Sequence, residues 1–254
     1  MAESSNLITS DPQTSCELSV VMPAYREARA LEQFLPTLVR DVEQLTPSFE
    51  VLVVDTMEPV DDTREVALSA GARHIFRTGG NSYGDAVRTG ISHSHGRYVL
   101  FMDGDGSHNP RDLPKLWAER GRYGIVIGSR YVRGGQTENP AILIWMSRML
   151  NHVYRIAFGL KVKDVSNSFR LYTGDPLRAL RLESNDFDIV EEILIRLVFG
   201  PARSTTVEVP VTFERRKAGE SKRKLGAFAL SYLSSMKKMR RFLKAEQTQI
   251  RGGR

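Results

Sequence analysis

Cysteine is nearly missing from this sequence: Cys16 is the only one among 254 residues. A single thiol excludes an internal disulfide framework and is typical of a reducing compartment, which favours a cytoplasmic protein. The first 16 residues also lack the charged and then apolar pattern of a secretion signal, and their polar composition predicts a short disordered lead. With 41% hydrophobic residues, the chain still has enough apolar surface to bury a substantial core.

No apolar run is free enough of charged residues to be expected to span a bilayer. The most apolar stretch, residues 140–160, is interrupted by Arg148, His152 and Arg155, which fall on one face of a helix. Such a helix would suit a membrane surface, with its cations at the level of the headgroups; packing against the protein's own core is the alternative. Residues 225–243 form a second candidate of this kind, apolar first and strongly basic later.

An excess of acidic charge is also missing. The net charge is +6, and positive residues are concentrated between 215 and 254. This charge favours anionic partners such as nucleotides, phospholipid headgroups or nucleic acid. We do not expect nucleic acid, because no helix-turn-helix, zinc-finger or aromatic RNA-binding pattern accompanies the basic residues.

Short apolar runs rich in β-branched and aromatic residues predict strands. They lie at 18–23, 49–55, 98–103 and 124–130, with a weaker one at 73–77. Helical spacing separates them, most clearly over residues 31–45, where Pro36 predicts a kink or a late start. Strands that alternate with helices predict an α/β fold with a doubly wound, mostly parallel sheet and flanking helices.

Polar and glycine residues follow each predicted strand at its carboxyl end. In an open sheet of this kind ligands bind at that edge, so these residues should converge on one crevice. They are Pro23, Tyr25 and Glu27 after the first strand, Asp55, Gly79 and Gly80 after the next two, Asp103 and Asp105 after the fourth, and Ser129 and Arg130 at the fifth.

The two carboxylates in "YVLFMDGDGSHNP" support the most specific prediction. Whether the strand persists or turns at the glycines, Asp103 and Asp105 should face the same point. Two carboxylates so close repel unless a cation lies between them, and hard oxygen ligands suit Mg²⁺ or Mn²⁺ with positions left for a substrate diphosphate. A calcium loop is excluded, because its sixth position needs glycine and holds His108. A plain Asp-Gly turn is the alternative for such a pair taken alone.

Three further segments carry polar or cationic residues suited to anions. Residues 164–172 combine Asp164 and Arg170 with small hydroxyl and amide side chains, although a loop with one ion pair would look the same. Residues 213–224 place basic residues on both sides of a glycine, as in a mobile loop that closes over a phosphate; a solvated charge run is the alternative. Residues 81–91 would start a helix whose N-terminal amides face an anion.

Taken in order, these segments resemble family 2 glycosyltransferases, and most closely the dolichol-phosphate (polyprenyl-phosphate) mannosyltransferases. The resemblance covers residues 18 to about 235. It rests on "SVVMPAYREARAL", "EVLVVD", "YVLFMDGDGSHNP", "GSRYVRGG", "DVSNSFRLY" and "EVPVTFERRKAGESK". It implies an inverting GT-A (Rossmann-like) domain over residues 17–224, followed by an amphipathic basic helix and tail at 225–254.

The resemblance also implies roles for individual residues. The nucleotide-binding positions are matched by Pro23, Tyr25, Glu27 and Asp55, and the metal-diphosphate motif by Asp103 and Asp105. Positions for acceptor and donor phosphates are matched by Arg130, Arg148, Ser168 and Arg170, and a mobile loop at the diphosphate by Arg216, Ser221 and Lys222. The catalytic set implied in this way is Asp105, Arg130, Arg216 and Lys222.

The implied reaction transfers a hexose, usually mannose from GDP-mannose, to a polyprenyl phosphate with Mg²⁺ or Mn²⁺ as cofactor. Its acceptor lies at the cytoplasmic face of the membrane. We therefore expect a peripheral catalytic domain that reaches lipid through its own surface helices or through a small membrane subunit.

The sequence departs from the family pattern in two places. Thr56, in "DTMEPVDDT", stands where a second aspartate is usual, which alters the nucleoside pocket. Asn167 replaces a common glycine beside the presumed acceptor site. Another nucleotide sugar, such as a UDP-sugar, or a soluble acceptor is therefore the alternative. A non-catalytic scaffold that binds sugar nucleotides is a further alternative, but the retained aspartates and arginines argue against it.

Overall fold

The computed structural model describes residues 16–214 and 235–244. Its strands are β1 (Cys16–Pro23), β2 (Phe49–Asp55), β3 (Arg73–Phe76), β4 (Gly96–Phe101), β5 (Ile125–Ser129), β6 (Gln136–Thr137), β7 (Arg170–Thr173), β8 (Thr206–Pro210) and β9 (Thr212–Phe213). Its helices are α1 (Ala28–Leu45), α2 (Thr63–Ser69), α3 (Tyr83–His93), α4 (Leu113–Ala118) after the 3-10 turn η1 (Pro110–Asp112), α5 (Ala141–Phe158), α6 (Gly174–Arg178) and α7 (Ile189–Phe199). Residues 235–244 are also helical.

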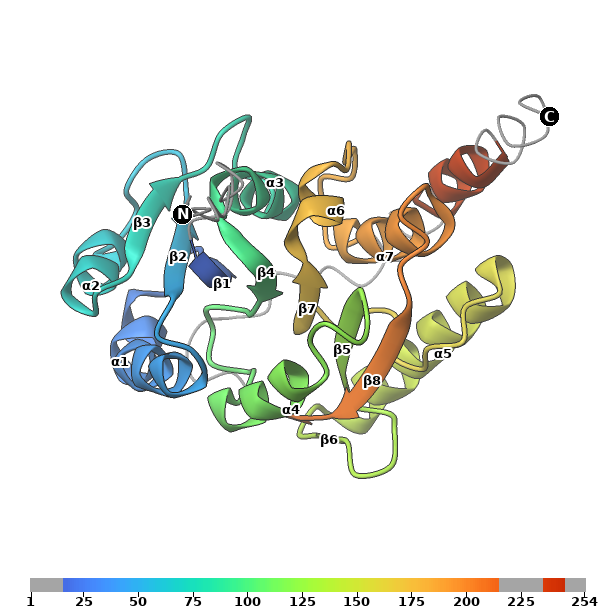
Figure 1. The fold of residues 1–254 in the computed structure, drawn as a ribbon, viewed down its shortest axis with the longest axis horizontal. Coiled ribbons are helices and arrows are strands. Elements are labelled where there is room, and N and C mark those ends of the chain that lie inside the picture. Colours follow the sequence, from blue (N-terminus) through green and yellow to red (C-terminus); the bar gives the residue numbers. More distant parts are fainter. Residues whose placement is uncertain (1–15, 215–234, 245–254) are drawn as a thin grey trace, which may run out of the picture.

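A seven-stranded sheet in the order β3-β2-β1-β4-β7-β5-β8 forms the centre of the molecule, with helices on both faces (Figure 1). Neighbouring strands run parallel except at β7, which is antiparallel to both β4 and β5. Strands β6 and β9 form a separate small parallel pair. The predicted α/β fold with a doubly wound, mostly parallel sheet is confirmed.

Side chains that alternate along the central strands enter two cores, one on each face of the sheet. Val20 and Met22 of β1 belong to the core under α1 and α4, whereas Val21 between them belongs to the core under α3 and α7. Met239, in the helix at 235–244, adds to the second core. This buried frame fixes where the strands end, and with them the residues that follow.

Helix α1 begins earlier than the sequence predicted. It starts at Ala28 and runs through Pro36 without a break to Leu45. The prediction of a late start is wrong because Leu31 and Leu35 are buried, so packing against the sheet holds the first turns in place. Pro36 lies on the exposed side, where the carbonyl that loses its helical hydrogen bond can meet water.

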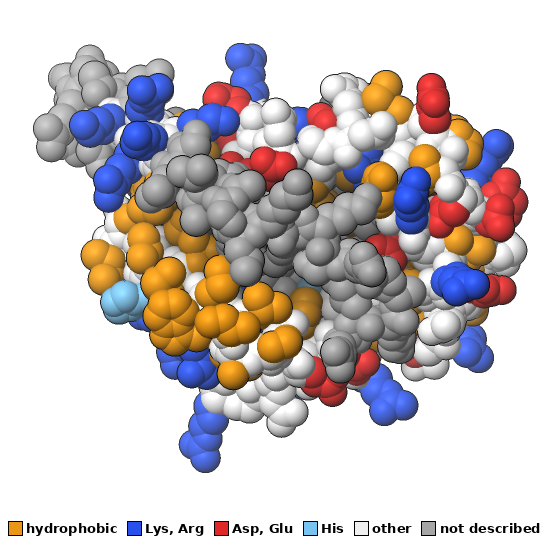
Figure 2. All heavy atoms as spheres, turned by 180° about the vertical axis from the view of Figure 1, so that it is seen from behind, with side chains coloured by type: hydrophobic (Ala, Val, Ile, Leu, Met, Phe, Trp, Pro, Cys, Tyr) orange, Lys and Arg blue, Asp and Glu red, His pale blue; other side chains and the backbone are white. Residues whose placement is uncertain are grey.

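Helix α5 carries apolar side chains on two opposite sides. Asn151, Tyr154 and Phe158 are its buried residues. At about 100° per residue, the opposite side carries a second stripe that is 41–71% exposed: Ile142, Trp145, Met149, Val153 and Ile156. Figure 2 shows hydrophobic side chains gathered on this side of the molecule. Among the described residues, no helix is long and apolar enough to cross a membrane.

Asp188, at the start of α7, predicts a pH effect on stability. Its carboxyl is buried near Ser184 and Ser235, and burial raises its pKa. The stability that this group contributes is therefore fully present below its ordinary pKa of about 4 and is lost as pH rises through the raised value. Asp188→Asn should raise the midpoint of thermal unfolding at pH 7 and change it much less at pH 4. Asp175→Asn, at an exposed acid of α6, serves as the control. An equal shift of Asp188→Asn at both pH values would contradict the assignment.

Candidate active site

The residues after β4 form a turn that brings its carboxylates to the rim of the sheet. The strand ends at Phe101, and Gly106 adopts a φ of 74°, which a side chain would strain. Asp103 Oδ2 accepts a hydrogen bond of 3.0 Å from Ser168 Oγ, and Asp105 Oδ1 accepts one of 2.9 Å from the Ser107 amide. Ser168, predicted to lie at a substrate phosphate, is thus placed beside Asp103, and the chain turns here instead of continuing as a strand.

The donor set of this turn fits a hard divalent cation. Asp103 keeps 23% of its side chain exposed, while Asp105 is almost buried. Among the described residues no group of three or more His, Cys, Asp or Glu side chains could hold a metal ion. Two carboxylates alone leave most positions of an octahedral ion open for water and for substrate phosphate oxygens, which is the arrangement that Mg²⁺ and Mn²⁺ accept.

Arg130, directly after β5, is locked by a two-pronged ion pair. Its Nε donates to Asp164 Oδ2 and its Nη2 to Asp164 Oδ1, each at 2.8 Å, and Nη2 also lies 3.1 Å from Ser166 Oγ. Such a fork fixes the plane of the guanidinium. The same guanidinium lies 5.1 Å from the centre of the Tyr131 ring. Residues 130 and 164 therefore form an ion pair that fixes the orientation of the Arg130 cation.

Arg148 belongs to a cationic hollow on the polar side of α5. Its guanidinium lies 5.3 Å from the centre of the Tyr131 ring, on which Arg130 also packs. The hollow has a volume of about 190 Å³ and is lined by Tyr131, Arg148, Asn151, His152, Arg155 and Lys163. Tyr131, which follows β5, is one of its walls, so the hollow lies beside the end of that strand.

The loop after β1 contains the predicted nucleotide-binding residues Pro23, Tyr25 and Glu27. Pro23 ends the strand, and Glu27 precedes the first turn of α1. Arg26 between them has a φ of 56°, a left-handed conformation that costs a non-glycine residue energy and often marks a functional loop. Tyr25 is partly exposed at this loop.

Arg77 ties this loop to the one after β3. Its side chain donates hydrogen bonds to the carbonyls of Ala24, Asn81 and Ser82. Burial lowers the pKa of the Arg77 guanidinium, against the opposing effect of nearby acidic groups. No local pattern in the sequence predicts this contact, because its partners lie in two separate loops.

Asp55, the fourth predicted nucleotide-binding residue, is buried and engaged within the protein. Its Oδ1 accepts a 2.7 Å hydrogen bond from the Thr56 amide, and its Oδ2 lies 3.2 Å from His74 Nε2. Thr56, the departure from the family pattern, in turn donates to the Glu58 carbonyl at 2.5 Å. The carboxylate therefore faces His74 instead of open solvent.

Arg170 is placed differently from the prediction that it contacts a substrate phosphate. Its side chain is fully buried, and it donates to the carbonyls of Val190 and Val165. The physical reason is strand alternation. Phe169 and Leu171 belong to the first core, so alternation sends Arg170 to the opposite face of the sheet, where it enters the second core and braces main chain.

The basic loop predicted over residues 213–224 begins at the carboxylate turn. The Glu214 amide donates to the Ser107 carbonyl at 2.8 Å, and Asn109 Nδ2 donates to Glu214 Oε1 at 2.7 Å. Arg216, Ser221, Lys222 and the predicted domain boundary after residue 224 lie outside the described residues.

Tyr83 and His108 are neighbours of Asp103 that the sequence did not single out for this role. Tyr83 Oη lies 3.4 Å from Asp103 Oδ1, and its ring stacks on Phe187. The helix start predicted within 81–91 is confirmed, with Ser82 and Asp85 forming a reciprocal cap. No local pattern identifies Tyr83, because its contact joins residues 20 apart in the chain, whereas His108 lies only five residues after Asp103, in the same turn.

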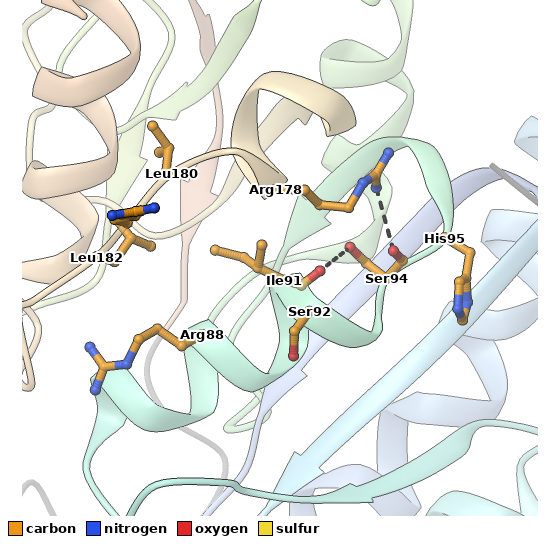
Figure 3. A pocket seen from close by; sticks show the side chains of 9 residues that line it. Arg88, Ile91, Ser92, Ser94, His95, Arg178, Leu180 and Leu182 are labelled. Atoms are coloured by element: carbon orange, nitrogen blue, oxygen red, sulfur yellow. Dashed lines mark hydrogen bonds between the residues drawn. The ribbon is translucent and has the colours of Figure 1, made fainter. Parts of the chain in front are cut away.

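A second hollow, of about 690 Å³, lies away from this site (Figure 3). It is lined by Arg88, Ile91, Ser92, Ser94, His95, Arg178, Leu180, Arg181 and Leu182. Arg178 donates to the Gly96 carbonyl, which places this hollow at the start of β4, whereas the carboxylates follow the end of that strand. Its arginines therefore do not serve the carboxylate turn.

Known proteins similar to this chain include glycosyltransferases. Residues 19–181 match the model of glycosyl transferase family 2. The chain is 33% identical over 218 residues to an undecaprenyl-phosphate mannosyltransferase of Micrococcus luteus, covering 80% of this chain and 85% of that protein. It is 34% identical over 225 residues to a dolichol-phosphate mannosyltransferase of Pyrococcus furiosus, covering 85% of this chain but 62% of that longer protein.

Solved structures share the fold at lower identity. One of glucosyl-3-phosphoglycerate synthase from Mycobacterium tuberculosis, in complex with Mn²⁺, uridine diphosphate and phosphoglyceric acid, superposes with a TM-score of 0.67 at 18% identity. The match covers 88% of this chain and 78% of that one. The GT-A fold and the glycosyltransferase activity implied by the motifs are confirmed. The chain belongs to glycosyl transferase family 2.

Proposed function

We propose that this chain is an inverting, metal-dependent transferase that moves a mannosyl group from GDP-mannose to a polyprenyl phosphate. The observation that carries the proposal is the turn that presents Asp103 and Asp105 at the rim of the sheet, where Ser168 donates a hydrogen bond to Asp103. Relatives at 33% and 34% identity, named as polyprenyl-type phosphate mannosyltransferases, support the substrate class. The altered loop at Thr56 bears on the donor and is treated separately below.

The donor side of the site would be built on β1 and β4. Pro23, Tyr25 and Glu27 would hold the nucleoside, and Asp103 and Asp105 would hold Mg²⁺ or Mn²⁺. The bound ion would neutralise the charge that develops on the departing nucleoside diphosphate. Arg216 and Lys222, in the basic segment that follows Glu214, would add positive charge to balance that of the diphosphate.

The acceptor side would need orientation more than a general base. A phosphate monoester is already anionic at neutral pH, so its oxygen can attack the anomeric carbon without first losing a proton to the enzyme. Arg130, held in one plane by Asp164, and Arg148 across Tyr131 would orient that phosphate. The attack would come from the face opposite the leaving diphosphate and invert the configuration.

One observation favours a second candidate donor. Asp55 would be expected to hold the nucleoside, yet its carboxylate is engaged by Thr56 and His74. A nucleoside base bound beside it would meet the Thr56 loop instead of a free carboxylate. A UDP-sugar is therefore the alternative to GDP-mannose, with the same metal and acceptor groups.

The exposed stripe of α5 would place the enzyme at its lipid substrate. Ile142, Trp145 and Ile156 present apolar side chains to solvent, and Arg148 and Arg155 lie beside them on the same helix. This combination suits the boundary between headgroups and acyl chains. The proposed location is the cytoplasmic surface of the membrane, with the protein lying on it.

A transfer assay with a panel of donors tests the proposed function. Purified protein with Mn²⁺ should move labelled mannose from GDP-mannose into an organic-soluble product when a polyprenyl phosphate is present. UDP-glucose and a soluble phosphorylated acceptor are run in parallel. Label that appears only in a water-soluble product would contradict the proposed lipid acceptor. Transfer from UDP-glucose alone would contradict the proposed donor. Binding of sugar nucleotides without any transfer would favour a scaffold.

A further inference from the structure

His108 lies at the centre of a buried hydrogen-bond chain that joins three strand ends. Its Nδ1 lies 3.0 Å from the Asp103 amide nitrogen, which follows β4. Its Nε2 lies 3.1 Å from Asn167 Oδ1, ahead of β7. Asn167 Nδ2 donates to the carbonyl of Gly128, in β5. Both His108 and Asn167 are almost completely buried.

The direction of every hydrogen bond in this chain is fixed by its two ends. The Asp103 amide can only donate, so His108 Nδ1 accepts and the ring proton is on Nε2. The Gly128 carbonyl can only accept, so the Asn167 amide presents its oxygen to that proton. The amide orientation of Asn167 and the tautomer of His108 therefore require each other, and neither partner has an alternative arrangement that satisfies both bonds.

The imidazole ring is also clamped on its faces and edge. It stacks on Phe169 with ring centres 4.9 Å apart and meets Phe213 edge to face at 5.4 Å. Phe213 is in β9, and the next residue, Glu214, bonds to Ser107 beside His108. The ring thus contacts the carboxylate turn, the segment before β7 and the strand that leads to residue 215.

We propose that His108 is a positioning residue for the carboxylate turn: Asn167, bonded to Nε2, and the aromatic clamp hold the ring so that Nδ1 orients Asp103 for the divalent cation. The distance from His108 Nε2 to Asp103 Oδ2 is 3.9 Å, so the ring steadies the main chain of Asp103 more directly than its carboxylate. Asn167, one of the two departures from the family pattern, acquires a role here as the group that fixes the ring. This inference rests on the proposed metal role of Asp103 and Asp105.

Three substitutions test separately what Nδ1, Nε2 and the stacking of the His108 ring contribute. His108→Asn keeps an acceptor near the position of Nδ1, His108→Gln keeps an amide near Nε2 but loses the bond to Asp103, and His108→Phe keeps only the stacking. The dissociation constant for Mn²⁺ is measured by electron paramagnetic resonance in the presence of GDP and, separately, of UDP. Thermal unfolding without metal reports the structural cost of each change. His93→Asn, at a histidine of α3 away from the turn, is the control.

His108→Gln and His108→Phe should weaken Mn²⁺ binding by about fivefold to tenfold, the worth of one hydrogen bond, while His108→Asn stays within about twofold of the wild type. Equal loss in all three, or wild-type binding in all three with lower unfolding midpoints, would overturn the proposal, because the ring would then act only by packing. If the glutamine and phenylalanine variants do not fold, Asn167→Ala provides the test. It releases the ring while keeping the histidine, and should weaken Mn²⁺ binding; unchanged binding would overturn the proposal. A wild-type chain that binds no Mn²⁺ with either nucleotide would instead refute the proposed function.

Discussion

Replacing Asp105 by asparagine should lower the rate of glycosyl transfer by more than about a hundredfold without unfolding the chain, as expected when a charge-stabilising group is lost. Asparagine keeps an oxygen for the hydrogen bond from the Ser107 amide, so the turn should keep its shape. What is lost is the negative charge that would hold the cation. Transfer of labelled sugar at saturating donor and Mn²⁺ measures the effect.

Thermal unfolding distinguishes this loss from simple damage to the fold. Without metal, the variant should unfold at or above the wild-type midpoint, because two neighbouring carboxylates repel and one of them has been neutralised. With Mn²⁺ and GDP at about a hundred times their dissociation constant, the wild type should gain about 2.7 kcal/mol and the variant much less. Asp175→Asn, at an exposed acid of α6, serves as the matched control. Normal turnover of Asp105→Asn would remove the cation from the proposed mechanism.

Replacing Trp145 and Ile156 together by serine should weaken binding to anionic vesicles by roughly a hundredfold. These side chains are 61% and 71% exposed, so neither is needed to hold the fold. If each enters the bilayer, each contributes on the order of 1.5 kcal/mol or more, and two such losses correspond to about a hundredfold in partitioning. Sedimentation with vesicles of phosphatidylcholine and phosphatidylglycerol measures the partition.

The matched control is Leu68→Ser, at a 54% exposed leucine on α2. It removes a similar apolar side chain from another surface and should leave vesicle binding unchanged. Raising the salt concentration should weaken wild-type binding to anionic vesicles, because Arg148 and Arg155 flank the stripe. A double variant that sediments like the wild type would show that α5 does not contact lipid.

The strands and the carboxylate turn could be predicted from the sequence because both depend on local patterns. The runs at 18–23 and 49–55 are mostly apolar and rich in β-branched residues, as is typical of strands buried on both faces. Asp103 and Asp105 follow such a run directly. The edge at which they lie then follows from the parallel topology alone.

The parts that could not be predicted depend on distant contacts. Arg170 lies next to residues that face the site, and only the strand register decides that its own side chain enters the core. Asp55 ends a strand as expected, yet His74 on the neighbouring strand takes its carboxylate. His108 and Asn167 are 59 residues apart in the chain, and no spacing rule joins them.

The reversed direction of β7 has a consequence for how this enzyme could be altered. Because β7 runs against β4 and β5, its entry at Arg170 lies at the catalytic rim and its exit at Thr173 lies beside Tyr98, near the beginning of β4. Insertions between α5 and β7 would displace Asn167 and Ser168 directly. A peptide inserted at the exposed Arg181, in the segment after α6, would instead emerge at the remote end of the sheet, where it should be tolerated without loss of turnover.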